Sequence, residues 1–189
     1  MKCDCILAGV GGQGVLSIAA IIAQAAAAEG FSVRQSEVHG MAQRGGAVLA
    51  HLRLSGEAIA GDLVPRGGAD LIISMEPLES LRYLAWLSPG GALVTAAEPM
   101  VNIPDYPELG EIHAAVKRLP KYSLVDAAAL AKEAGLARAV NMVMVGAASP
   151  YLPVKAETLE ETIEAVFAPK DPRIAEVNKL AFRKGRGEA

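Results

Sequence analysis

The chain has 189 residues, of which 52% are hydrophobic and 21% are charged, and its formal net charge is −3. This length suits one α/β domain with a substantial core and is short for two domains. The small negative charge gives no overall attraction for nucleic acid or anionic membranes, and no apolar run approaches the ~20 residues that span a bilayer. Asp4 interrupts the segment where a signal peptide carries basic residues, so we expect a cytoplasmic protein.

Apolar runs and helical periodicities alternate along the chain, with glycine or proline turns between them. Strands are predicted at residues 5–8, 31–33, 47–54, 58–60, 69–76, 92–95 and 122–125. Helices are predicted at residues 15–29, 77–87, 113–119, 127–134, 141–148, 157–167 and 172–185. The stretch 34–46 is polar and glycine-rich without a usable period, and 99–110 is rich in proline, so both are predicted to be irregular.

This alternation predicts an α/β fold: a Rossmann-like three-layer domain with a mostly parallel sheet and C-terminal helices. The first strand, first helix and second strand are expected to form a parallel βαβ unit. A turn at 55–57 between two strands predicts an antiparallel hairpin at the sheet edge. No repeat, low-complexity segment or linker divides the chain, so residues 1–189 are predicted to form a single domain.

The two cysteines, Cys3 and Cys5, stand two residues apart in the first predicted strand and therefore point to one face of it. Two thiolates cannot complete a four-thiolate iron–sulfur site. We expect a pair of buried strand cysteines, and any iron–sulfur chemistry would have to be supplied by another chain.

The segment Gly9-Val10-Gly11-Gly12-Gln13-Gly14 joins the first strand to the first helix and fits the pattern G-x-G-x-x-G. Backbone N–H groups at a helix start and the helix dipole attract an anion, and glycines let that anion approach closely. Gly12 exposes further backbone, and Gln13 adds an amide. The segment predicts a phosphate- or anion-binding turn; the alternative is a tight turn whose glycines only allow close packing.

A dinucleotide-binding domain has an Asp or Glu at the end of its second strand, where it holds a ribose hydroxyl. Here the predicted second strand ends at Val33 and is followed by Arg34, while the first acid, Glu37, falls in the predicted loop. Arg34 would suit a 2′-phosphate, but no group for hydride transfer is evident. A stand-alone NAD(P)-dependent reductase is therefore an alternative with less support.

A second motif, from Ser36 to Gly46, packs an acid, an imidazole, a thioether, an amide and a guanidinium between glycines. Glu37 and His39 could pair, which would orient the imidazole ring. Arg44 together with the following glycine backbone could bind a phosphate or carboxylate bidentately. The alternative is an ordinary solvated loop. The candidate binding residues of this motif are Glu37, His39, Gln43, Arg44, Gly45 and Gly46.

Two further features have a structural and a functional interpretation. Glu76 follows a buried strand and is expected at the carboxyl edge of the sheet, where α/β ligands bind, or as an acid that stabilises a helix start. The last helix is basic, which indicates a solvated face or a partner-binding surface. Its basic residues are Arg173, Lys179, Arg183, Lys184 and Arg186.

The glycine turn, taken together with Glu-Val-His-Gly-Met-Ala-Gln-Arg-Gly-Gly at 37–46, resembles the gamma-type domain of 2-oxoacid:ferredoxin oxidoreductases. Within that family the resemblance is greatest to the small (beta) subunit of the indolepyruvate enzymes. The segments 70–77, 141–146 and 178–185 fit it too, so the resemblance covers nearly the whole chain.

The resemblance implies oxidative decarboxylation of arylpyruvates such as indolepyruvate to aryl-acetyl-CoA, with CO₂ and reduced ferredoxin as products and coenzyme A as cosubstrate. It places thiamine diphosphate, magnesium and 4Fe-4S clusters on a large (alpha) subunit, so this chain is expected to be inactive alone. The loop from His39 to Arg44 would face the large subunit's cofactor, or an anionic group of the oxoacid or coenzyme A. No catalytic residue and no metal ligand is assigned to this chain. A Rossmann-like binding module without chemistry is a third possibility.

Overall fold

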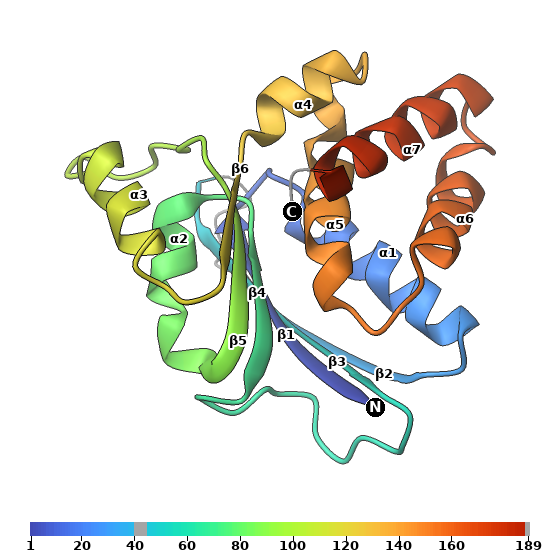
Figure 1. The fold of residues 1–189 in the computed structure, drawn as a ribbon, viewed down its shortest axis with the longest axis horizontal. Coiled ribbons are helices and arrows are strands. Elements are labelled where there is room, and N and C mark those ends of the chain that lie inside the picture. The colour runs from blue at the N-terminus through green and yellow to red at the C-terminus, as the bar shows by residue number, and fades with distance from the viewer. Residues whose placement is uncertain (40–44, 188–189) are drawn as a thin grey trace.

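A computed structural model, which describes residues 1–39 and 45–187, shows a six-stranded sheet between helical layers (Figure 1). The strand order is β2-β3-β1-β4-β5-β6. β1, β4, β5 and β6 are parallel neighbours, whereas β3 runs antiparallel to β1 and β2. The predicted α/β class with a mostly parallel sheet is confirmed. The strands are β1 Lys2–Val10, β2 Ser32–His39, β3 Ala47–Ser55, β4 Ala69–Ser74, β5 Leu87–Ala96 and β6 Tyr122–Val125.

Helices cover both faces of the sheet, with α1, α5, α6 and α7 on one side and α2 and α3 on the other (Figure 1). Their bounds lie close to the predicted ones for most of the chain, and Asp171 caps α7 as predicted by accepting the Arg173 N–H at 2.9 Å. The helices are α1 Val15–Ala28, α2 Pro77–Arg82, α3 Leu109–Val116, α4 Ala127–Glu133, α5 Val140–Ala148, α6 Ala156–Phe167 and α7 Pro172–Gly187. Short 3₁₀ turns lie at Leu84–Trp86, Ala137–Ala139 and Ser149–Tyr151.

The second strand is longer than predicted and occupies a different place in the sheet. β2 continues to His39, so residues 34–39 are extended rather than part of a loop. β3 lies between β2 and β1 and is antiparallel to both, so β1 and β2 run parallel as the predicted βαβ unit requires, but they are not neighbours in the sheet. Because β2 is an edge strand with mostly exposed side chains, its sequence lacks the apolar run that marks a buried strand.

The antiparallel hairpin is also displaced from its predicted position. Residues 58–60 form no strand, and the antiparallel partners of β3 are β1 and β2. β5 begins at Leu87 and includes residues 89–91, which were expected to be a turn. The register between β4 and β5 shifts from Ala69↔Leu87 to Leu71↔Ala92, and this bulge accommodates Pro89, which has no N–H for the ladder.

The predicted cysteine pair is confirmed. Cys3 and Cys5 are both buried and free, and their sulfur atoms lie 3.5 Å apart on one face of β1. The hydrogen bond with Cys3, and next burial, raise the pKa of the Cys5 thiol. Cys5 is therefore held as a protonated thiol, and both cysteines are buried in the core.

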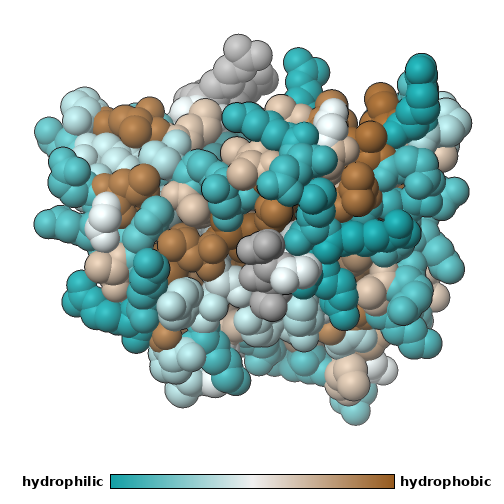
Figure 2. Space-filling view, turned by 45° about the horizontal axis from the view of Figure 1, so that its top comes forward, coloured by the Kyte–Doolittle hydropathy of each residue, from teal (hydrophilic) through white to brown (hydrophobic). Residues whose placement is uncertain are grey.

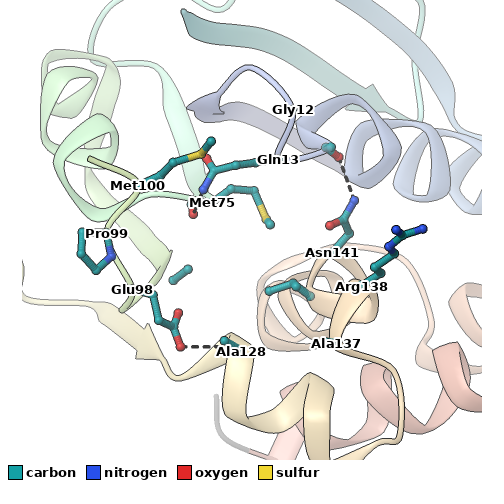
Figure 3. Close-up of a pocket in the computed structure, with 13 residues that line it drawn as sticks. Gly12, Gln13, Met75, Glu98, Pro99, Met100, Ala128, Ala137, Arg138 and Asn141 are labelled. Atoms are coloured by element: carbon teal, nitrogen blue, oxygen red, sulfur yellow. Dashed lines mark hydrogen bonds between the residues drawn. The ribbon is translucent and has the colours of Figure 1, made fainter. Parts of the chain in front are cut away.

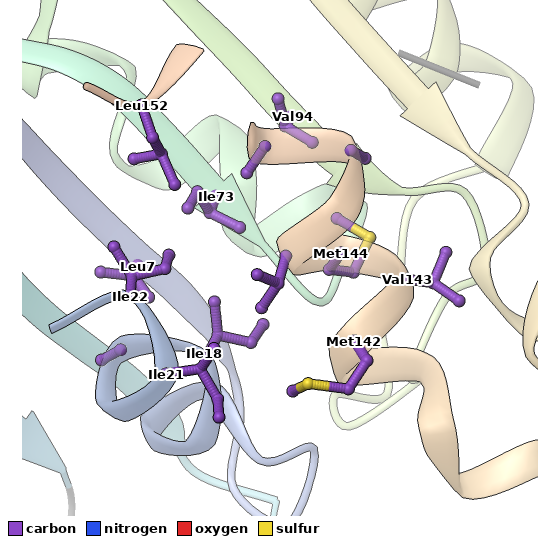
Figure 4. Close-up of a cluster of buried hydrophobic side chains, with 14 of the residues drawn as sticks. Leu7, Ile18, Ile21, Ile22, Ile73, Val94, Met142, Val143, Met144 and Leu152 are labelled. Carbon is purple, nitrogen blue, oxygen red and sulfur yellow. The ribbon is translucent and has the colours of Figure 1, made fainter. Parts of the chain in front are cut away.

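Helix α5 is the centre of the larger core cluster. Its residues 142–148 are all buried, between α1 and the sheet on one side and α4 and α7 on the other. Figure 4 shows Met142 and Met144 of α5 near Ile18 of α1 and Ile73 of β4. A helix that is apolar all round is typical of a buried helix, and the prediction of one here is confirmed.

α5 and α7 approach each other closely through two glycines. A Cβ atom added at Gly146 of α5 would lie 2.0 Å from the carbonyl oxygen of Phe182. A Cβ added at Gly185 of α7 would lie 2.0 Å from the carbonyl oxygen of Val143. The two backbones are thus in direct contact, which no larger residue at either position permits.

The basic residues of α7 pair with acids of the same chain. Lys179 lies 2.8 Å from Glu164 and 2.7 Å from Glu176, and Lys184 lies 2.8 Å from Glu133. Arg183 donates to Glu160 of α6 at 2.9 Å. These ion pairs link α7 to α4 and α6, so they account for much of the helix's basic character without a partner.

His51 of β3 holds the irregular segment between β3 and β4 against the sheet. Its ring is 5% exposed, and Nδ1 accepts a hydrogen bond from the Val64 N–H at 3.1 Å. Burial lowers the pKa of His51 below its usual value. The folded protein therefore keeps this imidazole neutral at pH values where the unfolded chain would protonate it.

We expect the free energy of unfolding to fall as the pH drops below about 6.5, the ordinary pKa of histidine. The unfolded state binds the extra proton there, so the slope from His51 reaches at most about 1.4 kcal/mol per pH unit and vanishes below the folded-state pKa. His51→Asn keeps an acceptor for Val64 and should flatten this part of the profile. Urea unfolding at pH 7.5 and 5.5 measures this pH dependence. An equal change in the free energy of unfolding between the two pH values in the wild type and in His51→Asn would contradict the assignment.

Candidate functional site

The glycine turn connects β1 to α1 at the carboxyl edge of the sheet. Gly14 is the N-cap of α1 and has φ 79°, a left-handed conformation that favours glycine. The side-chain amide of Asn141 donates to the Gly14 carbonyl at 3.1 Å, and a Cβ on Gly14 would lie 2.3 Å from that nitrogen. Gly14 is therefore needed both for the turn and for the approach of α5. Gly12 is exposed and also has a positive φ, 100°.

Gln13 stabilises this turn from within. Its Oε1 accepts the N–H of Val10 at 2.8 Å, and its Nε2 donates to the carbonyl of Met75 at 3.0 Å. The side-chain amide predicted to contribute to an anion site is thus engaged in joining the ends of β1 and β4. These two bonds use the side-chain oxygen and one of the two Nε2 hydrogens, so a contact between this amide and an anion stays a prediction.

The structure brings the two predicted motifs together. Gly11 donates to the Gly46 carbonyl at 2.8 Å, and Gly45 donates to the Gly11 carbonyl at 3.3 Å. The end of the second motif therefore lies directly on the glycine turn. This contact joins residues that are far apart in the sequence and could not be read from either motif alone.

The structure describes only some of the remaining candidate residues of the second motif. Glu37 lies on β2, and His39 is the last residue of that strand. Gln43, Arg44 and the side chain of His39 lie outside the described part of the structure.

The order of the strands, rather than the position of the first acid, distinguishes this sheet from that of a dinucleotide-binding domain. Glu37 stands near the carboxyl end of β2, not within a loop as predicted. However, β3 separates β2 from β1, so β2 lies two strand spacings, about 10 Å, from the strand that carries the glycine turn. The position of the neighbouring parallel strand in a dinucleotide-binding domain is filled here by an antiparallel one.

A cavity of about 590 Å³ opens beside the glycine turn (Figure 3). The turn, the ends of β4 and β5 and the starts of α4 and α5 form its walls. Clefts at the carboxyl edge of an open α/β sheet are the usual ligand sites of this architecture. The lining residues are Gly12, Gln13, Gly14, Met75, Ala96, Glu98, Pro99, Met100, Ala128, Ala137, Arg138, Val140 and Asn141.

Glu98 forms the acidic wall of the cavity. Its Oε1 accepts the Ala128 N–H at the start of α4, at 3.1 Å (Figure 3). Burial, and next the hydrogen bond with Asp126, raise the pKa of Glu98, while the same hydrogen bond lowers the pKa of Asp126. Glu98 therefore keeps its proton to a higher pH than an isolated carboxyl would, while Asp126 loses its proton at a lower pH.

Arg138 and Asn141 form the opposite side. Arg138 is exposed, and Figure 3 shows its guanidinium directed away from the middle of the cavity, past Asn141. Glu98, Arg138 and Asn141 were not among the residues predicted to form the site. Glu98 follows a buried strand as Glu76 does, so the rule that identified Glu76 could have found it. The local sequence does not mark Arg138 or Asn141 as cavity residues, because only tertiary packing brings them beside the turn.

Glu76 holds the connection between β5 and α3 at the sheet edge. Its side chain is 1% exposed, and Oε2 caps α2 by accepting the Glu79 N–H at 2.7 Å. Oε1 accepts the Tyr106 hydroxyl and, at 3.4 Å, the Met100 N–H. Burial first, and the hydrogen bond to Glu76 second, raise the pKa of Tyr106. Glu76 thus lies at the carboxyl edge and caps a helix, as the two interpretations expected of its position, while a role in binding a ligand stays a prediction.

Across residues 1–39 and 45–187, no group of three or more His, Cys, Asp or Glu residues is arranged to hold a metal ion. None of the helices described in those ranges has the length and apolar character to cross a bilayer.

Residues 4–188 match the family model described as pyruvate ferredoxin/flavodoxin oxidoreductase. The chain belongs to this family. One relative is the indolepyruvate oxidoreductase subunit IorB of Thermococcus kodakarensis, which is 40% identical over 95% of this chain and 92% of its own length. Another is the ketoisovalerate oxidoreductase subunit VorA of Methanothermobacter thermautotrophicus, 29% identical over 95% of this chain but only 35% of its own length.

Solved structures of the family share the fold. Pyruvate oxidoreductase subunit PORC of Thermotoga maritima superimposes with a TM-score of 0.74 at 24% identity, covering 99% of this chain and 96% of that one. The 2-oxoglutarate:ferredoxin oxidoreductase of Magnetococcus marinus, solved with 2-oxoglutarate, coenzyme A and succinyl-CoA bound, gives a TM-score of 0.78 at 23% identity. It covers the whole of this chain and 31% of that one.

Proposed function

We propose that this chain is the small subunit of an oxidoreductase that decarboxylates arylpyruvates such as indolepyruvate. In this reaction the carboxyl group leaves as CO₂, the acyl carbon is oxidised and joined to coenzyme A, and ferredoxin receives the electrons. The observation that carries the proposal is the 40% identity to an indolepyruvate oxidoreductase subunit over nearly the full length of both chains. The open cavity beside the glycine turn supports it.

A larger subunit would hold the thiamine diphosphate, magnesium and 4Fe-4S clusters. Cys3 and Cys5 are buried side by side in β1, so thiolate ligands for a cluster would come from another chain. Free, unpaired thiols also suit the reducing cytoplasm, where we place the complex. The role of this chain would be to build one wall of the active-site cavity.

The glycine turn and the end of the second motif would receive an anionic group of the substrates. Gly12 is exposed beside the start of α1, and Gly45 and Gly46 are hydrogen-bonded to Gly11. The helix dipole and backbone N–H groups favour a phosphate of coenzyme A or the oxoacid carboxylate. We assign Arg44 as the cation that completes this site, with His39 and Gln43 as its neighbours in sequence.

Arg44→Ala should raise the KM for coenzyme A or for the oxoacid about 10- to 100-fold in the reconstituted complex. A charge-assisted hydrogen bond to an anion contributes about 1.5–3 kcal/mol, which corresponds to that range. The assay is indolepyruvate-driven reduction of a viologen dye, with each substrate varied in turn. His39→Ala tests the imidazole in the same way.

Arg173→Ala is a matched control, because Arg173 is exposed at the start of α7. It should leave both KM values unchanged. Unchanged kinetics in Arg44→Ala and His39→Ala would overturn the loop assignment but not the subunit assignment. The subunit assignment is tested separately: a chain that binds NAD(P) alone and does not associate with a larger cluster-bearing subunit would be the stand-alone reductase.

A further inference from the structure

The connection between β5 and α3 presents apolar side chains around the mouth of the cavity. Pro99 is exposed, Met100 is 37% exposed and Val101 is 66% exposed. We call these three residues the rim surface. Val38, at the carboxyl end of β2, is 60% exposed near the same edge of the sheet. Figure 2, turned so that the top of Figure 1 comes forward, shows apolar side chains near the middle of the molecule among hydrophilic ones.

The rim surface is held in a fixed position by hydrogen bonds to the sheet edge. The buried Glu76 carboxylate accepts the Met100 N–H at 3.4 Å and the hydroxyl of Tyr106 farther along the connection. The amide of Asn102 donates to the Gly45 carbonyl at 3.0 Å. A partner that binds a surface fixed in this way pays little conformational entropy to order it. Exposed apolar residues on a fixed loop beside a functional cavity indicate a docking surface.

One family relative carries this domain within a longer chain. In the ketoisovalerate relative VorA, the region equivalent to this chain is 35% of the protein, so the domain is joined to a longer stretch of the same polypeptide. The domain is therefore built to work against a larger chain. A wall of a shared active site must meet its partner around the cavity, and the rim surface lies there.

We infer that the rim surface is the docking site for the larger subunit, which would cover Met100 and Val101 with an apolar surface of its own. This inference rests on the proposed function and specifies where the two subunits meet. Other exposed apolar residues lie elsewhere: Leu63 is in the connection between β3 and β4, and Ile174 is on α7.

The test compares aspartate substitutions at matched exposure. Val101→Asp is paired with Leu63→Asp, because Val101 is 66% exposed and Leu63 is 60% exposed. Met100→Asp is paired with Ile174→Asp, at 37% and 38%. Each variant small subunit is titrated against the tagged larger subunit, and the Kd is measured by biolayer interferometry. We expect the rim variants to weaken binding at least about tenfold, as for interface-centre residues, and the controls to change it less than about twofold.

Thermal unfolding of each isolated variant shows whether it folds, and Val101→Ala, which adds no charge, should weaken binding in the same direction. Equal affinities in rim and control variants would overturn the docking site while leaving the subunit assignment intact. If Val101→Asp instead dissociates a dimer of the isolated small subunit and leaves the complex unchanged, the occupant is a second copy and the inference is wrong. No association of the wild-type chains would overturn both the inference and the proposed function.

Discussion

Gly146→Ala and Gly185→Ala are each expected to lower the free energy of unfolding by about 3 kcal/mol, the upper part of the usual range for overpacking a core. In each case the added methyl carbon would lie 2.0 Å from a carbonyl oxygen of the opposite helix. Neither helix can move away freely, because α5 is buried on all sides. Urea unfolding followed by far-UV circular dichroism measures the loss.

Gly110→Ala is the control for the intrinsic effect of replacing a helical glycine. Gly110 lies in α3, and a Cβ there would meet no atom within 4 Å. Alanine favours helix over glycine, so this variant should be more stable by up to about 1 kcal/mol. Stability gains of similar size in Gly146→Ala and Gly110→Ala would show that α5 and α7 are not in contact as described.

The second large effect is expected at the buried ion pair between β1 and β3. Asp4 is fully buried, and Arg53 donates to both of its carboxylate oxygens, at 2.8 and 3.1 Å. Arg53→Met should lower the free energy of unfolding by about 3 kcal/mol, because it leaves a buried carboxylate with Lys2 as its remaining cation. The same change also removes the hydrogen bond from Arg53 to the Gly61 carbonyl.

A double substitution separates the charge from the packing. Asp4→Leu combined with Arg53→Met removes both charges and should cost less than Arg53→Met alone, because no unpaired carboxylate remains in the core. Arg34→Met, at the cross-strand neighbour of Arg53, is the matched control. Its contact with Asp62 is long, 3.8 Å, and exposed, so the loss should stay below about 0.5 kcal/mol. A double variant as unstable as the single one would refute the account.

Elements whose side chains are buried were predictable, because burial imposes a pattern on the sequence. The run of apolar residues at 142–148 predicts a core helix, and the glycines at 9–14 predict a strand-to-helix turn. The full extent of β2 was not predictable in this way. This strand is paired only through β3 and exposes most of its side chains, so residues 34–39 have the composition of a loop while their backbone is extended.

The site was predictable where a motif is local and not where packing assembles it. The glycine turn and the Gly45–Gly46 pair were both identified from sequence, and they meet in the structure. Glu98, Arg138 and Asn141 reach the cavity from elements that follow much later in the chain. Gln13 shows that residue type alone does not reveal a structural role: its type suggested a ligand contact, and its amide also joins two strands.

The position of α5 also determines when its apolar surface is covered during synthesis of the chain. α7 packs on α5 through Gly185, and its buried residues include Ala181 and Phe182. Until α7 has left the ribosome, the apolar side of α5 has no cover from it, although the sheet is already complete at Val125. Between the end of α5 at Ala148 and the end of α7 at Gly187, about a fifth of the chain, the nascent protein therefore carries an uncovered hydrophobic surface of the kind that chaperones protect.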